Sequence, residues 1–571
     1  MKLSEIYGNL VDKGFFGKPE ERGVLEEAIS RVDNVLAEGK ETVIVHLPPG
    51  SGKTAIAYSA AFKTLVYSEP WYRVVHALPL RSVIEDVYGR LREGLREVSI
   101  DFENVFSKQM FLSENSPYLQ SKYVITTFDT FLLELIKLPP TVIRKVSAEL
   151  SLGHFEIGRA SIFSSLIFFD ETHLLLEGNS EGRKTLTTVF RFLRKIGVPV
   201  VIMTATLPTK LENYIASELE GKIYTIKFSE IARKNIRDEY LERELSKKVE
   251  MEKKPIELSN FTEDVSRKLA DIGGRRATIV NTIARAVEIY RKLDVEKKVL
   301  LHSQFTLKDR SEKVELLKKA EVAVTTQVIE AGVNVSFDYI ISELAPITNV
   351  IQRIGRLARF KEKKGLFIIV YDRESLMGNG VYDENYVLLT LKVLDKVADK
   401  EVLWHLPSIF EKLGYDKIID TVWENMSINE LFSLYPSALN QILSNPMLSS
   451  KDALRFIESL IMLNRGSIIR NDIFATVYLG DEEVSSEEEV FEKAEEKLVP
   501  VGAIRLFRQI RRKGVEGEIR VVVREDNRVF EEDFTKYSSI RKWCLDWIRS
   551  RIVTVRVPTK YYSSEYGLLL H

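Results

Sequence analysis

The sequence has little cysteine and no excess of charge of either sign. One cysteine, Cys544, stands among 571 residues, which excludes a disulfide framework and a zinc site built on several cysteines. A single thiol is also typical of a reducing cytoplasm, where we expect this protein. The 82 basic and 83 acidic side chains leave a formal net charge of −1, so any nucleic-acid surface has to be a local patch.

Long apolar runs are missing as well. None approaches the roughly 18 residues that a membrane-spanning helix needs, and the N-terminal segment lacks the apolar stretch of a secretory signal. We therefore expect no membrane partner. Apolar residues at 45% and charged residues at 29% indicate a globular chain of several domains. The many Glu, Lys and Arg residues beside one Cys favour a thermophilic source.

Two series of short apolar runs predict an α/β fold with two tandem RecA-like parallel-sheet domains. The runs are apolar on both faces, as strands inside a parallel sheet are, and helical patterns between them can supply the crossovers. We expect a first domain over 1–228 and a second over 229–375, joined by a polar stretch, 229–260, without a clear strand. The runs are 42–47, 73–79, 123–128, 165–169 and 198–206, then 277–282, 298–303, 322–326, 339–344 and 365–371.

The pattern changes after residue 375, and we expect an accessory region over 376–571 that is mixed and largely helical. Segments 383–413 and 427–465 look helical, whereas 481–497 carries nine acids against two lysines and is typical of a solvated linker or helix. The last part, 501–571, has fifteen basic and nine acidic residues and combines a basic helix with β-like runs.

Two features of that last part have an ordinary structural alternative. A helix over 505–514 would place Arg505, Arg508 and Arg512 on one face, which could bind DNA or a partner or simply face solvent. Trp543 and Trp547, four residues apart, are predicted to be core residues, and Cys544 between them is predicted to be an inert buried thiol.

A phosphate-binding loop is predicted between residues 47 and 54. The sequence LPPGSGKT follows a predicted strand and opens an Ala-rich helix, which is the context of a Walker A loop. Its glycines let backbone N–H groups surround phosphates, Lys53 can reach the β- and γ-phosphates, and Thr54 offers a hydroxyl to Mg²⁺. Leu47 stands where the general pattern has its first Gly, and the alternative is a Gly-rich turn with an accidental Lys. The predicted nucleotide ligands are Pro49, Gly50, Ser51, Gly52, Lys53 and Thr54.

Acidic residues follow the buried run 165–169. Asp170 is placed to hold Mg²⁺, commonly through water, and Glu171 to polarise the water that attacks a phosphoryl group. His173 is interpreted as a relay to the next motif, with a structural hydrogen bond as the alternative. Thr204 and Thr206 end the next strand, where hydroxyls can bond to the acidic box and couple it to the domain interface. A solvated strand end is the alternative for all of these carboxylates.

The sequence QRIGRLAR at 352–359 predicts the catalytic contribution of the second domain. Arg356 and Arg359 are three residues apart, so we expect them on one helix face. Two guanidinium groups can then reach a γ-phosphate across a cleft and stabilise transition-state charge. Gln352 completes the predicted catalytic set. The alternative is a surface pair that binds carboxylates.

The order GSGKT, DETH, TAT and QRIGRLAR resembles superfamily 2 DExH helicases over about residues 40–360. Finer detail resembles the signature helicase of type I CRISPR interference. The segments that carry this likeness are HALPLRSVIEDVYGRL (76–91), VITTFDTFL (124–132), LLHSQFTLKDR (300–310) and TTQVIEAGVNVSFD (325–338).

The resemblance implies a set of nucleic-acid contacts. Small polar side chains and backbone amides suit phosphates because they position a strand without reading its sequence. Each of these residues also has an alternative as a core or strand-end residue. The residues that match are Pro79, Arg81, Thr126 and Thr127 in the first domain, and His302, Ser303, Thr325 and Thr326 in the second.

Two departures concern the nucleotide. Gly332 matches a glycine near the nucleotide, but the Asp usual two residues later is Asn334 here, which puts a carboxylate contact to the ribose in question. The stretch upstream of residue 47 lacks the Gln that often reads adenine. The preference for ATP is therefore not visible in these residues. ATP with Mg²⁺ is what the resemblance implies.

The implied activity is 3′ to 5′ translocation on single-stranded DNA displaced by a guide-RNA surveillance complex. Such helicases are commonly fused to an HD nuclease, but none of the seven His residues here precedes an Asp and no pair has HxxxH spacing. The predicted phosphate loop also begins near residue 47. We therefore expect a stand-alone helicase, as in some archaea, with a separate HD nuclease subunit. A general DExH DNA-repair or RNA helicase, and a nucleotide-gated DNA clamp or recruitment subunit, are the alternatives.

Overall fold

The computed structural model describes most of the chain. Among the described residues, no helix is both long and apolar enough to cross a membrane. The residues described are 1–17, 20–39, 42–66, 71–79, 81–98, 105–110, 117–147, 155–177, 180–234, 236–252, 254–330, 333–360, 364–428, 435–462, 472–525 and 528–570.

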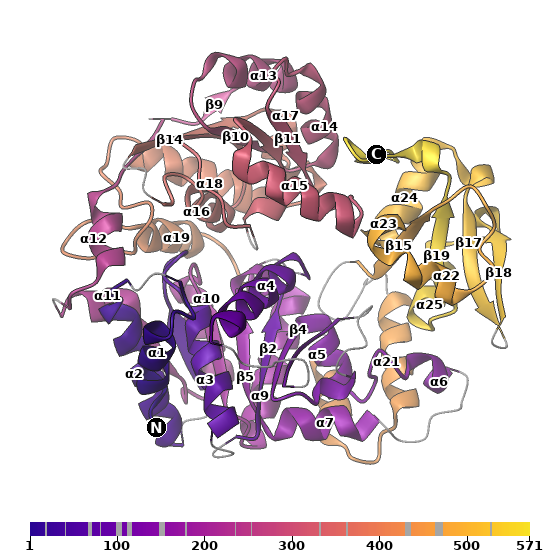
Figure 1. The fold of residues 1–571 in the computed structure, drawn as a ribbon, viewed down its shortest axis with the longest axis horizontal. Coiled ribbons are helices and arrows are strands. Elements are labelled where there is room, and N and C mark those ends of the chain that lie inside the picture. Colours follow the sequence, from indigo (N-terminus) through magenta and orange to yellow (C-terminus); the bar gives the residue numbers. More distant parts are fainter. Residues whose placement is uncertain are drawn as a thin grey trace. The chain divides into compact units, whose positions relative to one another are not determined.

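The first sheet has seven parallel strands in the order β3-β4-β2-β5-β6-β1-β7 (Figure 1). All five predicted runs form strands. Two further strands, β3 and β7, are short and partly polar, and they carry too little apolar periodicity to be recognised. The bounds are β1 Thr42–His46, β2 Arg73–Leu78, β3 Phe106–Gln109, β4 Tyr123–Thr127, β5 Ser165–Asp170, β6 Val200–Thr204 and β7 Tyr224–Lys227.

Helices that pack on this sheet present an apolar face to it. In α9, for example, the buried Leu186, Phe190 and Leu193 recur at helical spacing. The helices found along this part of the chain, which include α6 of the other compact unit described below, are α1 Leu3–Asp12, α2 Gly23–Ala37, α3 Thr54–Val66, α4 Arg81–Glu97, α5 Phe128–Leu135, α6 Ile143–Ser147, α7 Phe155–Phe163, α8 His173–Leu176, α9 Ser180–Lys195 and α10 Thr209–Glu218.

The polar stretch 229–260 differs from its prediction. It contains two strands, β8 Lys248–Met251 and β9 Ile256–Glu257, both paired with β14 (Lys364–Tyr371). Exposed and half-buried residues alternate in β8, so no buried apolar run marks it in the sequence. The same part of the chain holds α11 Phe228–Ala232 and α12 Glu239–Ser246.

The second sheet runs in the order β11-β12-β10-β13-β14-β8. All five predicted runs of the second series form strands. Two tandem RecA-like parallel-sheet domains are thus confirmed as the fold class. The remaining bounds are β10 Arg276–Ile279, β11 Lys298–Leu301, β12 Val322–Thr325 and β13 Tyr339–Glu343, with helices α13 Phe261–Asp271, α14 Ile283–Lys292, α15 Leu307–Lys319 and α16 Ile347–Ile354.

A helical stretch and then a mixed sheet follow, as the sequence predicts for the accessory region. The sheet order is β16-β15-β19-β17-β18. The helices are α17 Arg373–Leu376, α18 Glu384–Val397, α19 Tyr415–Glu424, α20 Tyr435–Ser444, α21 Ser450–Met462, α22 Glu487–Glu492, α23 Ala494–Lys497, α24 Ala503–Lys513 and α25 Ile540–Ile548. The strands are β15 Phe474–Leu479, β16 Leu498–Gly502, β17 Arg520–Glu525, β18 Arg528–Asp533 and β19 Ile552–Val557, followed by the hairpin β20 Tyr562–Ser563 and β21 Gly567–Leu568.

The core of this last sheet confirms three predictions. Trp543 and Trp547 are buried, and Trp543 Nε1 donates to the carbonyl of Ala503 at 2.8 Å. Cys544 is buried beside them, and burial raises the pKa of its thiol to about 12. A thiol with that pKa is not ionised near neutral pH and is therefore inert.

The chain groups into two compact units. The first comprises residues 1–140, 153–258 and 329–447, and the second 141–152, 259–328 and 448–571. The first unit contains the whole first sheet together with α16 and the arginines after it. The predicted phosphate loop, acidic box and arginine pair therefore lie within one unit.

Within this unit, Glu177 connects the helix after the acidic box to the start of α16. Its Oε2 accepts hydrogen bonds from Thr348 Oγ1 at 2.5 Å and from the Tyr386 hydroxyl at 3.1 Å. Burial raises the pKa of Glu177 to about 8, against the hydrogen bonds that lower it. The protonated carboxyl is therefore the form that the fold favours.

Glu177→Gln should change how stability depends on pH. Because the folded-state pKa lies above the ordinary value of 4.5, wild-type stability is greatest below pH 4.5 and falls as pH rises toward 8. Gln keeps the accepting oxygen without the charge. We expect the variant to gain up to a few kcal/mol over wild type between pH 5 and 9, since one pKa unit corresponds to about 1.4 kcal/mol. Denaturant unfolding across this range measures the difference, and parallel curves for both proteins would contradict it.

Candidate nucleotide-binding site

The topology of the first sheet brings three predicted motifs to one edge. Strands β5, β6 and β1 are neighbours, and their register pairs Asp170 with Met203 and His46 with Thr204. Because the strands are parallel, the segments that follow them leave at the same edge, where open α/β sheets bind ligands. The backbone N–H of Leu47 also donates to the carbonyl of Thr204 at 3.1 Å.

The predicted phosphate loop has the backbone shape that its glycines allow. Gly50 and Gly52 have φ values of 82° and 91°, in the left-handed region that side chains rarely adopt. The N–H of Ser51 donates to the carbonyl of Pro48 at 3.2 Å, and α3 begins at Thr54. A turn of this kind at a helix N-terminus is the arrangement that binds phosphate.

Lys53 and the two carboxylates form a buried charged cluster at the ends of β1 and β5. Lys53 Nζ lies 3.4 Å from Glu171 Oε1, and His76 Nε2 lies 3.5 Å from Asp170 Oδ2. Burial raises the pKa of Glu171, and the charge of Asp170 adds to this effect. Burial also opposes ionisation of Asp170, but the imidazole of His76 and the charge of Lys53 outweigh it and hold the pKa of Asp170 below its usual range. The two pKa values are thus pushed apart, which is the pattern of a charged ligand beside a proton acceptor.

His173 joins the acidic box to the end of β6. Its Nδ1 lies 3.3 Å from Thr204 Oγ1 and 3.5 Å from Glu171 Oε2. Burial and the charge of Lys53 lower the pKa of His173 to about 3, so the ring is neutral near pH 7. The N–H of Thr206 donates to Thr204 Oγ1 at 3.4 Å. The residues predicted to couple the motifs are thus in contact, while the coupling itself stays a prediction.

The arginine pair differs from its prediction. Helix α16 ends at Ile354, before both arginines, so Arg356 and Arg359 do not share a helix face. Gly355 caps the helix, and Ala358 has a positive φ of 45° and donates its N–H to the carbonyl of Phe337. The chain therefore turns away after Gly355, which the three-residue spacing could not indicate.

The two arginines consequently have different surroundings. Arg356 is buried and donates from Nη1 to the carbonyl of Val333 and from Nη2 to that of Glu330, both at 2.6 Å. Arg359 Nη2 lies 3.8 Å from the position that a Cβ on Gly50 would occupy, so its guanidinium faces the phosphate loop. Burial, together with the charge of Arg90, lowers the pKa of Arg359.

Unsatisfied polar atoms test whether these residues fit a nucleotide. Buried polar groups are normally hydrogen-bonded. Within the described residues, six predicted motif side chains each have a buried atom without such a bond, which fits a site built for a polar ligand. The atoms are Ser51 Oγ, Glu171 Oε2, His173 Nε2, Thr206 Oγ1, Gln352 Nε2 and Arg356 Nε.

The oxygen donors fit Mg²⁺ as well. A hydroxyl at Thr54 and an ionised carboxylate at Asp170 are ligands of the type that Mg²⁺ takes alongside substrate phosphates and water. No group of three or more His, Cys, Asp or Glu side chains placed to hold a metal occurs in the described part of the chain. A Mg²⁺ site at which phosphate and water supply most of the ligands is compatible with that finding.

The predicted nucleic-acid residues of the first domain are mostly buried. Thr126 Oγ1 donates to the carbonyl of Gln109 at 2.8 Å, and Thr127 Oγ1 accepts the N–H of Thr130 at 3.1 Å and caps α5. These hydroxyls serve the strand end, which was the alternative interpretation. Pro79 is buried, and Arg81 is partly exposed at the start of α4.

Three of the four residues of the second domain, His302, Thr325 and Thr326, are also buried within the fold. His302 is fully buried, with Nε2 donating to the carbonyl of Tyr566 at 3.0 Å and Nδ1 accepting the N–H of Gln304 at 3.2 Å. The C-terminal hairpin thus covers its ring. Thr325 Oγ1 donates to the carbonyl of Leu301 at 2.9 Å, Thr326 is buried, and Ser303 is partly exposed. Nucleic-acid binding by these positions stays a prediction, and Gly332 lies outside the described residues.

Sequence reasoning missed three residues that contact the motifs. The hydroxyl of Tyr240 donates to the carbonyl of Pro49 at 3.0 Å, and that of Tyr415 donates to the carbonyl of Ala205 at 3.1 Å. His405 Nε2 lies 3.1 Å from the carbonyl of Ile354. Each is an isolated polar residue outside any motif, so only the tertiary fold reveals its place.

Comparisons with known proteins agree with this arrangement. Residues 26–214 match the family model for DEAD/DEAH box helicases, and residues 273–362 match that for CRISPR-associated nuclease/helicase Cas3, C-terminal. The CRISPR-associated nuclease/helicase Cas3 of Methanothermobacter thermautotrophicus is 24% identical over 497 residues, which cover 83% of this chain and 55% of the relative. The CRISPR-associated helicase Cas3 of Thermoproteus tenax is 25% identical over 490 residues, which cover 81% of this chain and 75% of the relative.

Coverage and fold complete the comparison. A Cas3 relative from Methanocaldococcus jannaschii is 33% identical over 222 residues, 29% of its length. This chain therefore spans about half of the Methanothermobacter thermautotrophicus relative and less than a third of the Methanocaldococcus jannaschii relative. The crystal structure of T. fusca Cas3 matches with a TM-score of 0.62 at 16% identity, covering 98% of this chain and 69% of that one. At that identity, the structural match shows a shared fold.

Proposed function

We infer that this chain is a superfamily 2 DExH helicase that works as an ATP-driven translocase on single-stranded DNA. Its sequence resembles the Cas3 helicases over most of its length. The observation that carries this proposal is the cluster of Lys53, Glu171 and His173 at a phosphate loop whose Gly50 lies beside the guanidinium of Arg359. A loop that binds phosphate, a carboxylate with a raised pKa and a guanidinium group are the parts that phosphoryl transfer requires.

Each residue then has a role in hydrolysis. Lys53, which contacts Glu171 in this structure, would turn to the β- and γ-phosphates and leave Glu171 free to take a proton from the attacking water. Arg359 would stabilise charge that develops on the γ-phosphoryl group. Mg²⁺, held by Thr54 and Asp170, would neutralise phosphate charge when bound. His173 and Thr204 would couple this change at the nucleotide to the second domain.

The finer parts of the proposal follow the relatives. We propose that the strand is DNA displaced by a guide-RNA surveillance complex, since two curated relatives are named as CRISPR-associated Cas3. We also propose that a separate HD nuclease cuts the strand. Two relatives support this part of the proposal by their names and coverage. The chain covers 75% of the Thermoproteus tenax relative, which is named a helicase, and 55% of the Methanothermobacter thermautotrophicus relative, which is named a nuclease/helicase.

Strand displacement tests this function. A duplex with a 3′ single-stranded DNA tail should be opened in the presence of ATP and Mg²⁺, whereas one with a 5′ tail should not. A matched pair of RNA-tailed duplexes tests the choice of strand. Opening of the RNA substrates alone would favour a general RNA helicase. Strand binding without any opening would favour a nucleotide-gated clamp.

A further inference from the structure

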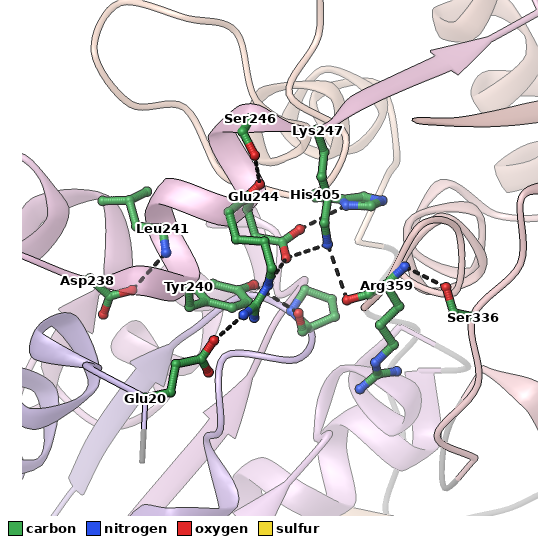
Figure 2. A network of polar contacts seen from close by, with 12 residues as sticks. Glu20, Asp238, Tyr240, Leu241, Glu244, Ser246, Lys247, Ser336, Arg359 and His405 are labelled. Atoms are coloured by element: carbon green, nitrogen blue, oxygen red, sulfur yellow. Dashed lines mark hydrogen bonds and ion pairs between the residues drawn. The ribbon is translucent and has the colours of Figure 1, made fainter. Parts of the chain in front are cut away.

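Three charged side chains join α12 to the turn that carries Arg359 (Figure 2). Glu244 Oε1 accepts a hydrogen bond from Lys247 Nζ at 2.6 Å, and Glu244 Oε2 accepts one from His405 Nδ1 at 3.0 Å. Lys247 Nζ also donates to the carbonyl of Arg359 at 3.3 Å, and His405 Nε2 donates to that of Ile354 at 3.1 Å. One carboxylate thus reaches both ends of the turn 354–359 through Lys247 and His405.

The partners of these side chains are acceptors. A carboxylate and a carbonyl only accept hydrogen bonds, and each ring nitrogen of His405 lies within hydrogen-bond distance of one of them. Burial opposes ionisation of Glu244, but His405 and Lys247 outweigh it and hold the pKa of Glu244 below its usual range. The side chains of Glu244, Lys247 and His405 are 5%, 2% and 8% exposed. Loss of the carboxylate would leave the buried ammonium group of Lys247 without its counter-charge.

The same helix contacts the phosphate loop. Tyr240, one turn earlier on α12, donates its hydroxyl to the carbonyl of Pro49 at 3.0 Å. On the other side of the turn, Ser336 Oγ accepts the N–H of Arg359 at 2.8 Å. Helix α12 therefore connects the loop that would hold the phosphates to the backbone of the arginine that faces it.

We propose that Glu244, acting through Lys247 and His405, is a positioning residue that holds the turn 354–359 so that Arg359 faces the phosphates. This inference rests on the proposed function, because it assigns Arg359 a part in hydrolysis. Arg359 can stabilise a developing charge only from a fixed place, and a displacement of about 1 Å can reduce a rate by about 10²-fold.

The test compares ATP hydrolysis in the full chain and four variants with single-stranded DNA present. Glu244→Gln should lower the single-turnover rate by about 10- to 100-fold. Affinity for a fluorescent ADP analogue should change by less than about threefold, since Lys53 and the loop remain. Glu244→Asp, which keeps the charge, should recover part of the rate. Glu218→Gln, which removes a partly exposed carboxylate paired with Arg191, should match wild type. Lys247→Met keeps the Glu244–His405 pair and serves if Glu244→Gln does not fold.

A double variant separates positioning from general stability. If Glu244 acts through Arg359, adding Glu244→Gln to Arg359→Ala should reduce the rate by less than about threefold further. The full effect of Glu244→Gln in that background would overturn the inference, as would a wild-type rate for both Glu244→Gln and Lys247→Met. Absence of hydrolysis by the unchanged chain would overturn the proposed function, and this inference with it. Hydrolysis by the unchanged chain with unaffected variants would overturn this inference alone.

Discussion

Arg359→Ala should lower the rate of ATP hydrolysis by about 10³-fold or more, the scale of an arginine that stabilises phosphoryl-transfer charge. Its guanidinium faces the loop at Gly50. Nucleotide affinity should change little, because Lys53 and the loop backbone supply the ground-state contacts. Single-turnover hydrolysis with saturating ATP measures the rate, and a fluorescent nucleotide measures the affinity.

Arg356→Ala is the matched comparison. Arg356 bonds the carbonyls of Glu330 and Val333, so its loss should destabilise the turn by about 1–3 kcal/mol for each buried carbonyl left unpaired. We expect a lower melting temperature as its main effect. A near-normal rate for Arg359→Ala, with a large loss for a stably folded Arg356→Ala, would reverse the two assignments.

Glu171→Gln should retain ATP binding and lose turnover by about 10²- to 10⁴-fold, the contribution of a positioned general base. Gln has the same shape but cannot take the proton. Burial raises the pKa of Glu171, so the wild-type rate should rise with pH through a value above the ordinary glutamate pKa of 4.5. The variant should lack that limb of the profile.

Lys53→Ala is the control for this assignment. It removes the cation that contacts Glu171 and that would hold the phosphates, so binding and hydrolysis should fall together. Hydrolysis by Glu171→Gln at the wild-type rate would show that another group accepts the proton.

The sequence predicts the sheets well because buried parallel strands leave continuous apolar runs, as in 165–169. It also predicts the site at the ends of β1, β5 and β6, since the motif residues follow those runs directly. Strand β8 was not predicted, because an edge strand whose residues alternate in exposure has no continuous apolar run. The helix assigned to Arg356 and Arg359 was wrong because residue spacing does not show where Gly355 ends α16.

Tertiary contacts explain the rest. Glu244 and His405 are 161 positions apart in the chain, and neither belongs to a motif, so nothing in the sequence indicates that they meet. His302 was predicted to touch nucleic acid. In the structure its ring donates a hydrogen bond to the carbonyl of Tyr566 in the C-terminal hairpin, a contact that the sequence does not indicate. A sequence pattern identifies chemistry at strand ends, whereas the residues that hold those ends in place become visible only in the fold.

The most direct test of the account is the rate of ATP hydrolysis with and without single-stranded DNA, with single-stranded RNA as comparator. The account predicts strong stimulation by DNA that disappears in Glu171→Gln. Stimulation by RNA alone, or equal rates with and without either strand, would contradict a motor on single-stranded DNA.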